Sequence, residues 1–312
     1  MQPEPLVSVI IPAYNAEGTI RNAIESVLRQ TVSDLEVIVA DDASADNTTQ
    51  VVSTIPDPRV RLVKAQTNSG PSAARNLGVK GARGRWVAFL DADDEWVPDR
   101  LGYLLGAAQG DERFVADWFA PCSVAPDGRL TPVENPLLPT DGGVDDFDFV
   151  RFLKLGRCVY PIVPKVAFDT YGVTFPEWGS GGEWAFLIAR LSASGVRGKL
   201  VHRVGYLYRV TGAHDGSTLR AIEEQLKVQE FLAKGPGVSQ EAMVLLQRGI
   251  PGIRKRLVVA ALREGKWRKL AHYASKNPTD LLILPGSVVR FLLRKLQYWR
   301  ASRNPTATEN LG

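Results

Sequence analysis

The sequence predicts an α/β fold in which a Rossmann-like, mostly parallel sheet is flanked by helices and followed by a C-terminal helical extension. Over the first hundred residues, short apolar runs rich in β-branched residues alternate with segments of helical periodicity. This alternation is typical of a parallel sheet covered by helices. After Ser217 the pattern is mainly helical through Lys276. A chain of 312 residues is long enough for one substantial domain and an extension.

Four strands are predicted, each too short and too continuously apolar to be an amphipathic helix. They cover residues 6–11, 35–40, 60–64 and 86–90.

Four helices are predicted around these strands and beyond. The first has apolar residues at helical spacing from Ile20 to Leu28, with Thr19 as its cap. Others follow residues 46–48, run from Pro71 to Gly81, and run from Glu183 to Ala193. From residue 111 to about 147 the chain is rich in Pro, Gly and Asp, and variable loops over a site are expected there.

Composition excludes several classes of protein. Cys122 and Cys158 have neither the number nor the spacing of a disulfide framework or a zinc site, which favours a reducing, cytoplasmic compartment. The first residues lack the pattern of a secretory signal, and no window has the roughly 20 apolar residues of a membrane-spanning helix. The formal charge of +4 is concentrated after residue 248, without an aromatic-interleaved nucleic-acid motif. These basic helices either contact an anionic membrane peripherally or present a solvated face.

Polar side chains follow each predicted strand, at the sheet edge where ligands of parallel sheets bind. Residues 41–44 read Asp-Asp-Ala-Ser, and residues 91–94 read Asp-Ala-Asp-Asp. Carboxylates after a buried strand are costly unless they are solvated, paired or bound to a cation. Asp91 and Asp93 suit a hard divalent ion held together with nucleotide phosphates, so Mn²⁺ or Mg²⁺ is the expected cofactor.

Four segments in order resemble glycosyltransferase family 2, whose members have the GT-A fold. They are residues 7–15 (VSVIIPAYN), 41–48 (DDASADNT), 70–78 (GPSAARNLG) and 89–94 (FLDADD). The resemblance implies a nucleotide-sugar-dependent, inverting transferase. Its donor-side residues would be Pro12, Tyr14 and Asn15 beside the nucleoside, Asp42 on the base, Arg75 near the base or phosphates, and Asp91 near the ribose.

The same resemblance implies a metal ligand and a catalytic base. Asp93 takes the aspartate-x-aspartate position that holds the metal, and His214 would donate to phosphate or add a metal ligand. The family's base is typically the second acid of a Glu-Asp pair before a tryptophan. Residues 181–186 read Gly-Gly-Glu-Trp-Ala-Phe, so Glu183 takes the base position and Gly182 replaces the first acid.

The resemblance divides the chain into three parts. Residues 1–110 would bind the nucleotide sugar, residues 111–220 would hold the acceptor and the base, and residues 221–312 would form the helical extension with a partly disordered tail. The expected partners are a nucleotide-sugar donor, with UDP favoured, and a glycan or lipid-linked acceptor, with no nucleic acid. Single-sugar addition is expected because the Gln-x-x-Arg-Trp motif of processive synthases is absent.

Two other functions stay open at this stage. A non-catalytic nucleotide-sugar-binding or assembly protein is the main alternative, since Gly182 departs from the family's pattern. A sugar-nucleotide pyrophosphorylase fits less well, because residues 12–15 (PAYN), directly after the first strand, contain no glycine. The Gly-x-Gly-x-x-Gly of dinucleotide-dependent oxidoreductases is also absent there.

Overall fold

The computed structural model describes residues 4–276, apart from 111, 126–127, 129, 134–140, 156–158, 178–180, 211–218 and 236. His214, Cys158 and the predicted disordered tail therefore lie outside the described residues. The division into three parts at residues 110 and 220 stays a prediction.

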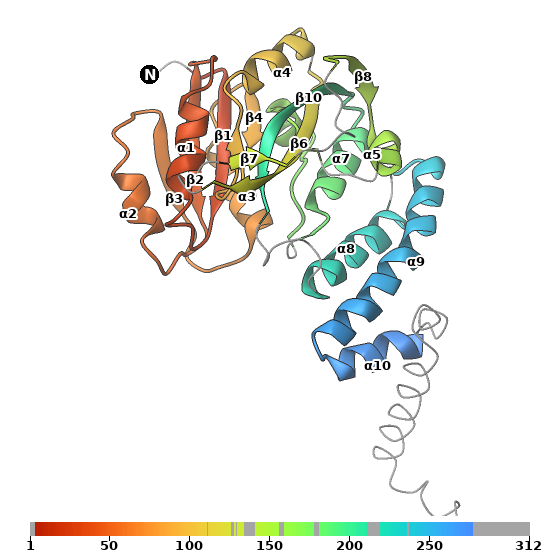
Figure 1. Ribbon diagram of the computed structural model, residues 1–312. Coiled ribbons are helices and arrows are strands. Elements are labelled where there is room, and N and C mark those ends of the chain that lie inside the picture. Colours follow the sequence, from red (N-terminus) through yellow and green to blue (C-terminus); the bar gives the residue numbers. More distant parts are fainter. Residues whose placement is uncertain are drawn as a thin grey trace, which may run out of the picture.

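The first sheet confirms the predicted parallel core (Figure 1). Its strand order is β3-β2-β1-β4-β9, parallel except for the last strand. The strands are β1 (Val7–Ala13), β2 (Leu35–Asp41), β3 (Val60–Lys64), β4 (Trp86–Phe89) and β9 (Val163–Pro164). β1 and β2 are buried along their whole length, which explains why their sequences are continuously apolar instead of alternating.

The helices of this half lie where periodicity places them. They are α1 (Ile20–Leu28), α2 (Thr48–Ser53), α3 (Pro71–Gly81) and α4 (Arg100–Ala108). Thr19 is the N-cap residue of α1, but its side chain makes no capping hydrogen bond. α3 packs against β1 and β2, and Gly78 sits so close to β1 that an added Cβ would lie 2.3 Å from Ile10 Cγ2.

A second sheet corrects the expectation of loops between residues 111 and 147. Its order is β5-β10-β6-β7, with β8 also pairing with β10. The strands are β5 (Glu95–Trp96), β6 (Phe114–Val124), β7 (Leu130–Pro132), β8 (Val144–Phe147) and β10 (Gly198–Arg209). β6 does not read as a buried strand because Asp117 interrupts its apolar run. In the fold Asp117 is fully buried and receives two hydrogen bonds from Arg100, at 2.9 and 2.7 Å.

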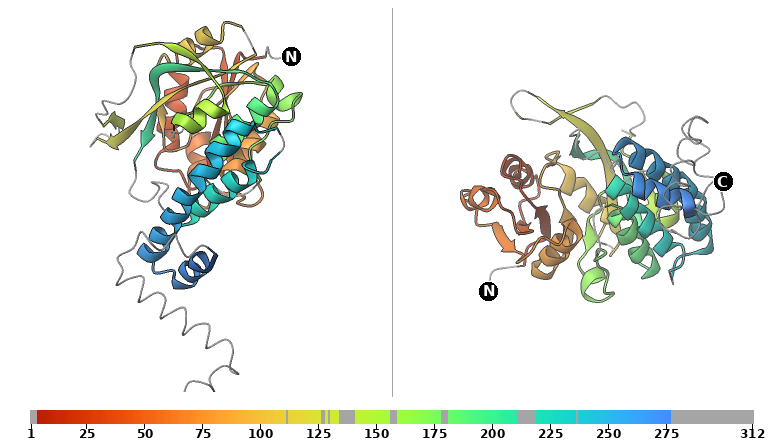
Figure 2. Two further views of the ribbon diagram at one scale, coloured as in Figure 1. Left: turned by 90° about the vertical axis from the view of Figure 1, so that its right-hand side faces the viewer. Right: turned by 90° about the horizontal axis from the view of Figure 1, so that it is seen from below.

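The remaining helices of the described chain all follow β8 in sequence. They are α5 (Phe149–Leu155), α6 (Val166–Asp169), α7 (Glu183–Ala193), α8 (Leu219–Leu232), α9 (Gln240–Arg263) and α10 (Trp267–Lys276). α9 packs against α5 and α8, and its C-terminal part projects with α10 away from both sheets (Figures 1 and 2). Among the described residues, no helix is long and apolar enough to cross a membrane.

The helix α9 contributes to two separate apolar cores. Ala242 and Leu246 belong to the main core around the sheets, whereas Ile253 and Leu257 belong to a small core shared by α8, α9 and α10. Pro251 lies inside the helix between these two sets of residues. A proline there has no N–H to donate, so the carbonyl one turn earlier lacks its helical partner.

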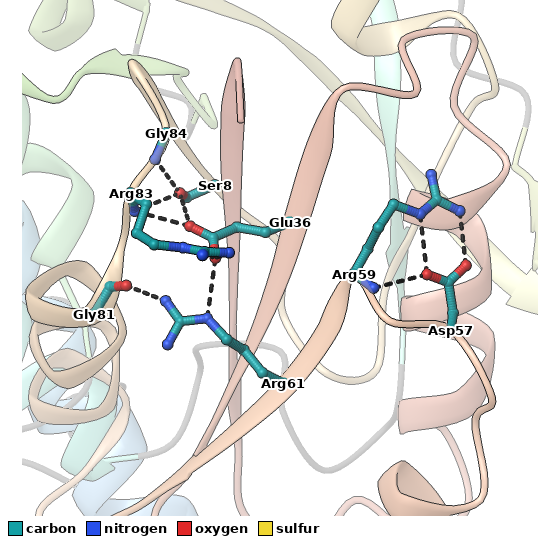
Figure 3. Close-up of polar contacts among 8 residues, drawn as sticks. All are labelled: Ser8, Glu36, Asp57, Arg59, Arg61, Gly81, Arg83 and Gly84. Atoms are coloured by element: carbon teal, nitrogen blue, oxygen red, sulfur yellow. Dashed lines mark hydrogen bonds and ion pairs between the residues drawn. The ribbon is translucent and has the colours of Figure 1, made fainter. Parts of the chain in front are cut away.

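Opposite the carboxyl ends of the strands, a buried carboxylate ties β1, β2 and the segment after α3 together (Figure 3). Glu36 accepts hydrogen bonds from Ser8 Oγ (2.7 Å), Arg61 Nε (3.0 Å) and Arg83 Nη2 (3.0 Å). Burial works to raise the pKa of Glu36, but the hydrogen bonds from Ser8, Arg83 and Arg61 outweigh it and hold the pKa below its ordinary value.

Candidate active site

Two loops at the carboxyl ends of β1 and β2 are joined by hydrogen bonds. Asn15 Oδ1 accepts the N–H of Ala45 at 2.8 Å, and the Asn15 N–H donates to Ser44 Oγ at 3.0 Å. Pro12 is buried in β1, whereas the Tyr14 side chain is half exposed beside these loops. The predicted contact of these three residues with a nucleoside stays a prediction. The structure adds that Asn15 shapes the loop itself.

Asp42 lies at the same edge of the sheet, directly after β2. Its carboxylate is buried and accepts the N–H groups of Ser69 (3.0 Å) and Gly70 (2.7 Å), the latter being the N-cap residue of α3. A carboxylate is favoured at a helix N-terminus. Asp42 thus fixes the start of α3, and its predicted hydrogen bond to the base stays a prediction. Next to it, Ala43 has φ 59°, a left-handed conformation that favours glycine.

Arg75 on α3 links two carboxylates that are far apart in the sequence. Its Nη2 donates to Asp91 Oδ1 at 2.5 Å, and its Nη1 donates to Glu183 Oε1 at 3.3 Å. Asp91 directly follows β4 and Leu90, while Glu183 is the first residue of α7. The guanidinium therefore connects the end of the parallel sheet with the helix that carries the predicted base.

The surroundings of Arg75 hold it in one position. Only 2% of its side chain is exposed, and its guanidinium lies 5.0 Å from the ring centre of Trp184 and 5.4 Å from that of Phe175. Burial alone would lower the pKa of Arg75, but the charges of Asp91 and Glu183 raise it above the ordinary arginine value. Arg75 is thus a permanent buried cation between two carboxylates.

Glu183 is held from two sides at the N-terminus of α7. Its Oε2 accepts the N–H of Gly181 at 2.7 Å, while Oε1 faces Arg75, and 13% of its side chain remains exposed. Gly182 precedes it with φ 81°, and an added Cβ would lie 3.1 Å from Val228 Cβ. The missing first acid of the family's pattern therefore has a local reason, since this turn and the packing of α8 favour glycine.

The run from Asp91 to Asp94 gathers negative charge after β4. Asp94 is buried and accepts the N–H of Arg209 at 2.7 Å, and Arg209 Nε donates to the Asp93 carbonyl at 2.8 Å. The Tyr206 hydroxyl accepts the Asp91 N–H at 3.0 Å. Burial, together with the charges of Asp91 and Asp93, raises the pKa of Asp94 well above its usual range.

The donor set of this run fits a divalent cation. Asp93 is partly exposed between Asp91 and Asp94, and among the described residues Asp94 Oδ2 has no hydrogen-bond partner despite its burial. Clustered carboxylate oxygens are the ligands that Mg²⁺ and Mn²⁺ prefer. No group of three or more His, Cys, Asp or Glu in the described part of the chain forms a metal site by itself. A metal held by Asp93 therefore needs other ligands, such as phosphate oxygens.

Sequence reasoning gave no role to three residues that the structure brings to this site. Tyr206 and Arg209 come from β10 and bind the run after β4, and Trp184 packs on Arg75. Asp94 was part of the recognised motif, so its position carried a signal. Tyr206 lies more than a hundred residues later in the chain, outside every recognised segment, and carries none.

Comparison with known proteins identifies the family. The family model for glycosyl transferase family 2 matches residues 8–142. The succinoglycan biosynthesis protein ExoO of Rhizobium meliloti is 32% identical over 278 residues, which cover 86% of this chain and 79% of that protein. The chain belongs to glycosyltransferase family 2. The predicted family and the assignment as an enzyme are thereby confirmed.

Other relatives of this family 2 glycosyltransferase match part or all of it. The E. coli protein WfgD, a UDP-Glc:alpha-D-GlcNAc-diphosphoundecaprenol beta-1,3-glucosyltransferase, is 47% identical over 96 residues, or 31% of this chain and 38% of that protein. The crystal structure of S. aureus TarS 1–349 in complex with UDP-GlcNAc covers 93% of this chain and 88% of that one, with a TM-score of 0.65 at 18% identity. At that identity the likeness concerns the fold.

Proposed function

We propose that this glycosyltransferase moves a single sugar from a UDP-sugar to a glycan acceptor on a lipid carrier, with inversion at the anomeric carbon and with Glu183 as the base. The observation that carries this proposal is the bridge from Asp91 through Arg75 to Glu183. It joins the residue expected beside the donor to a carboxylate at the start of α7. A positioned base next to the donor is what a single displacement requires.

The donor and acceptor classes rest on related proteins. WfgD is named for UDP-glucose and a diphosphoundecaprenol-linked acceptor, and TarS has been solved with UDP and with UDP-GlcNAc. ExoO and ExoU are named for succinoglycan biosynthesis. These names favour a UDP-sugar and cell-surface glycan assembly for the present chain. A cytoplasmic location, at the inner face of the membrane, belongs to the same proposal, and the buried free thiol of Cys122 suits a reducing compartment.

In the proposed reaction, Glu183 accepts the proton of an acceptor hydroxyl as that oxygen attacks the anomeric carbon. The bond from this carbon to the diphosphate oxygen breaks on the opposite face, and the nucleoside diphosphate leaves with the electron pair. Arg75 holds Glu183 and balances its charge. Asp93, with His214, would hold Mg²⁺ or Mn²⁺, which when bound neutralises the charge of the leaving diphosphate.

A panel of UDP-sugars, scored for release of UDP in the presence of diphosphate-lipid-linked acceptors, tests the function. We expect turnover with Mn²⁺ or Mg²⁺, and its loss with chelator or in Asp93→Ala. Glu183→Gln is expected to retain donor binding and lose transfer by about 100- to 10,000-fold, the usual contribution of a general base. Glu112→Gln is the matched control, since Glu112 is exposed just before β6, at the end of that strand opposite Arg209 and the site.

Three outcomes would overturn parts of the proposal. Retained transfer by Glu183→Gln would remove Glu183 as the base. Donor that stays intact with every acceptor, although it binds, would favour the non-catalytic alternative. An unaltered rate in chelator would remove the metal without touching the base.

A further inference from the structure

The C-terminal half of α9 is amphipathic, with its apolar side already covered. Its buried side chains belong to the small core that α9 shares with α8 and α10; they are Ile253, Leu257, Val258, Ala260 and Ala261. On the other side, Lys255, Val259 and Arg263 are exposed at a spacing of four residues, which places them along one face. This exposed face is therefore available to a partner.

Three more exposed residues follow where α9 gives way to α10. Lys266, Trp267 and Arg268 are all exposed, and 52% of the Trp267 surface is open to solvent. Val259, on α9, is 48% exposed. A large aromatic ring and an aliphatic side chain thus stand among cations. We call the set Lys255, Val259, Arg263, Lys266, Trp267 and Arg268 the basic face.

The charge of this region is strongly one-sided. Between residues 242 and 276 the sequence has nine Lys and Arg and one acidic residue, Glu264. Two of the cations hold α8 in place: Arg254 is paired with Glu230, and Lys269 with Glu223, both at 2.7 Å. Lys255, Lys266 and Arg268 are exposed elsewhere on this surface, and the one-sided charge of the region favours an anionic partner.

Two occupants from the same protein are disfavoured by charge. Residues 277–312 contain five Lys and Arg against two acidic residues, so that segment has the same sign as the basic face. A second copy of the chain would likewise bring cations against cations. The partner must therefore be a different, anionic surface.

We propose that the basic face docks the enzyme on a bilayer that contains anionic phospholipids. Cations near a bilayer are attracted by the negative surface potential, and tryptophan is enriched at the membrane–water interface. A nucleic acid would bind through the cations alone, and contact with the exposed side chain of Val259 would add little to its affinity. The assignment depends on neither the donor nor the base, so it can fail while the proposed transfer stands.

Sedimentation of the full chain with vesicles tests the proposal. We expect binding to vesicles of phosphatidylglycerol mixed with phosphatidylcholine, and no binding to phosphatidylcholine alone. The double variant Lys255→Glu and Lys266→Glu is expected to lower the apparent vesicle affinity by at least about 30-fold, since each cation near the surface contributes roughly fivefold. Trp267→Ala should lower it by about tenfold.

The matched control reverses two exposed lysines in the other half of the protein, Lys64→Glu with Lys80→Glu. It makes the same change in net charge and should keep vesicle binding within about threefold of the unaltered chain, because screening confines the attraction to about 10 Å. Circular dichroism and UDP release confirm that each variant is folded. Equal losses of vesicle affinity in both double variants would mean that net charge alone causes the binding, and they would overturn the basic face as the binding surface. If the protein bound heparin and Trp267→Ala lost no vesicle affinity, the bilayer would be overturned as the partner.

Discussion

Replacing Arg75 with lysine is expected to lower turnover by about 10- to 150-fold while the protein stays folded. Two different nitrogens of Arg75 reach Asp91 and Glu183, at 2.5 and 3.3 Å. A lysine ammonium keeps the charge but lacks the planar fork, so it can hold one carboxylate well and not both. Loss of one charge-assisted hydrogen bond costs about 1.5–3 kcal/mol. If the base loses that stabilisation in the transition state, the activation free energy rises by the same amount, and the rate falls tenfold for each roughly 1.4 kcal/mol.

The assay compares kcat and the KM for the donor in Arg75→Lys with those of Arg21→Lys. Arg21 is exposed on α1, so its substitution makes the same chemical change away from the site. We expect kcat to fall more than KM rises, because the base acts in the transition state. Thermal unfolding separates this effect from a loss of stability. A kcat for Arg75→Lys within twofold of the control would refute the reasoning that Arg75 positions Glu183.

Three further predictions concern stability. The pKa of Glu36 is lowered in the folded protein, so its ionised form stabilises the fold above the ordinary glutamate pKa of about 4.5. This stabilisation is lost as the pH falls through the lower folded value. In urea unfolding, Glu36→Gln should therefore lower the free energy of unfolding by about 1–3 kcal/mol at pH 7 and by less at pH 3. Gly205→Ala should cost about 3 kcal/mol or more, because its Cβ would lie 1.9 Å from the Tyr103 hydroxyl, whereas Gly106→Ala, with nothing within 4 Å, should be neutral or slightly stabilising. Ala43→Gly should raise the melting temperature by a few degrees if it relieves about 1 kcal/mol of left-handed strain, and an unchanged value would contradict that strain.

The four parallel strands of the first sheet could be predicted from their own sequences, whereas the short antiparallel strand β9 could not. β1, β2 and β4 are buried throughout, so their apolar runs are continuous, and their ends lie within two residues of the predicted ones. α3 and α7 begin and end as predicted, since Pro71 suits a first turn and Glu183 suits a helix N-terminus. In these segments local preference and tertiary packing agree.

The second sheet and the electrostatic links could not be predicted, because they depend on partners remote in sequence. Asp117 makes β6 look like a loop until Arg100 is seen beside it, fully buried. Arg75 was expected near the donor, but its observed carboxylate partners are 16 and 108 residues away. A single sequence records neither pairing. It shows the charged residues but not which of them neutralise one another.

The proline inside α9 has a consequence for how the molecule comes apart. On one side of Pro251 the helix is fastened to the main core, and on the other to the small core of α8 and α10. Backbone protection from solvent deuterium should therefore drop at the turn around Pro251 and recover on both sides of it. Under mild denaturant the far part of the helix would then melt as its own cooperative unit, while the first sheet and α3, which position Asp91 and Arg75, keep their protection.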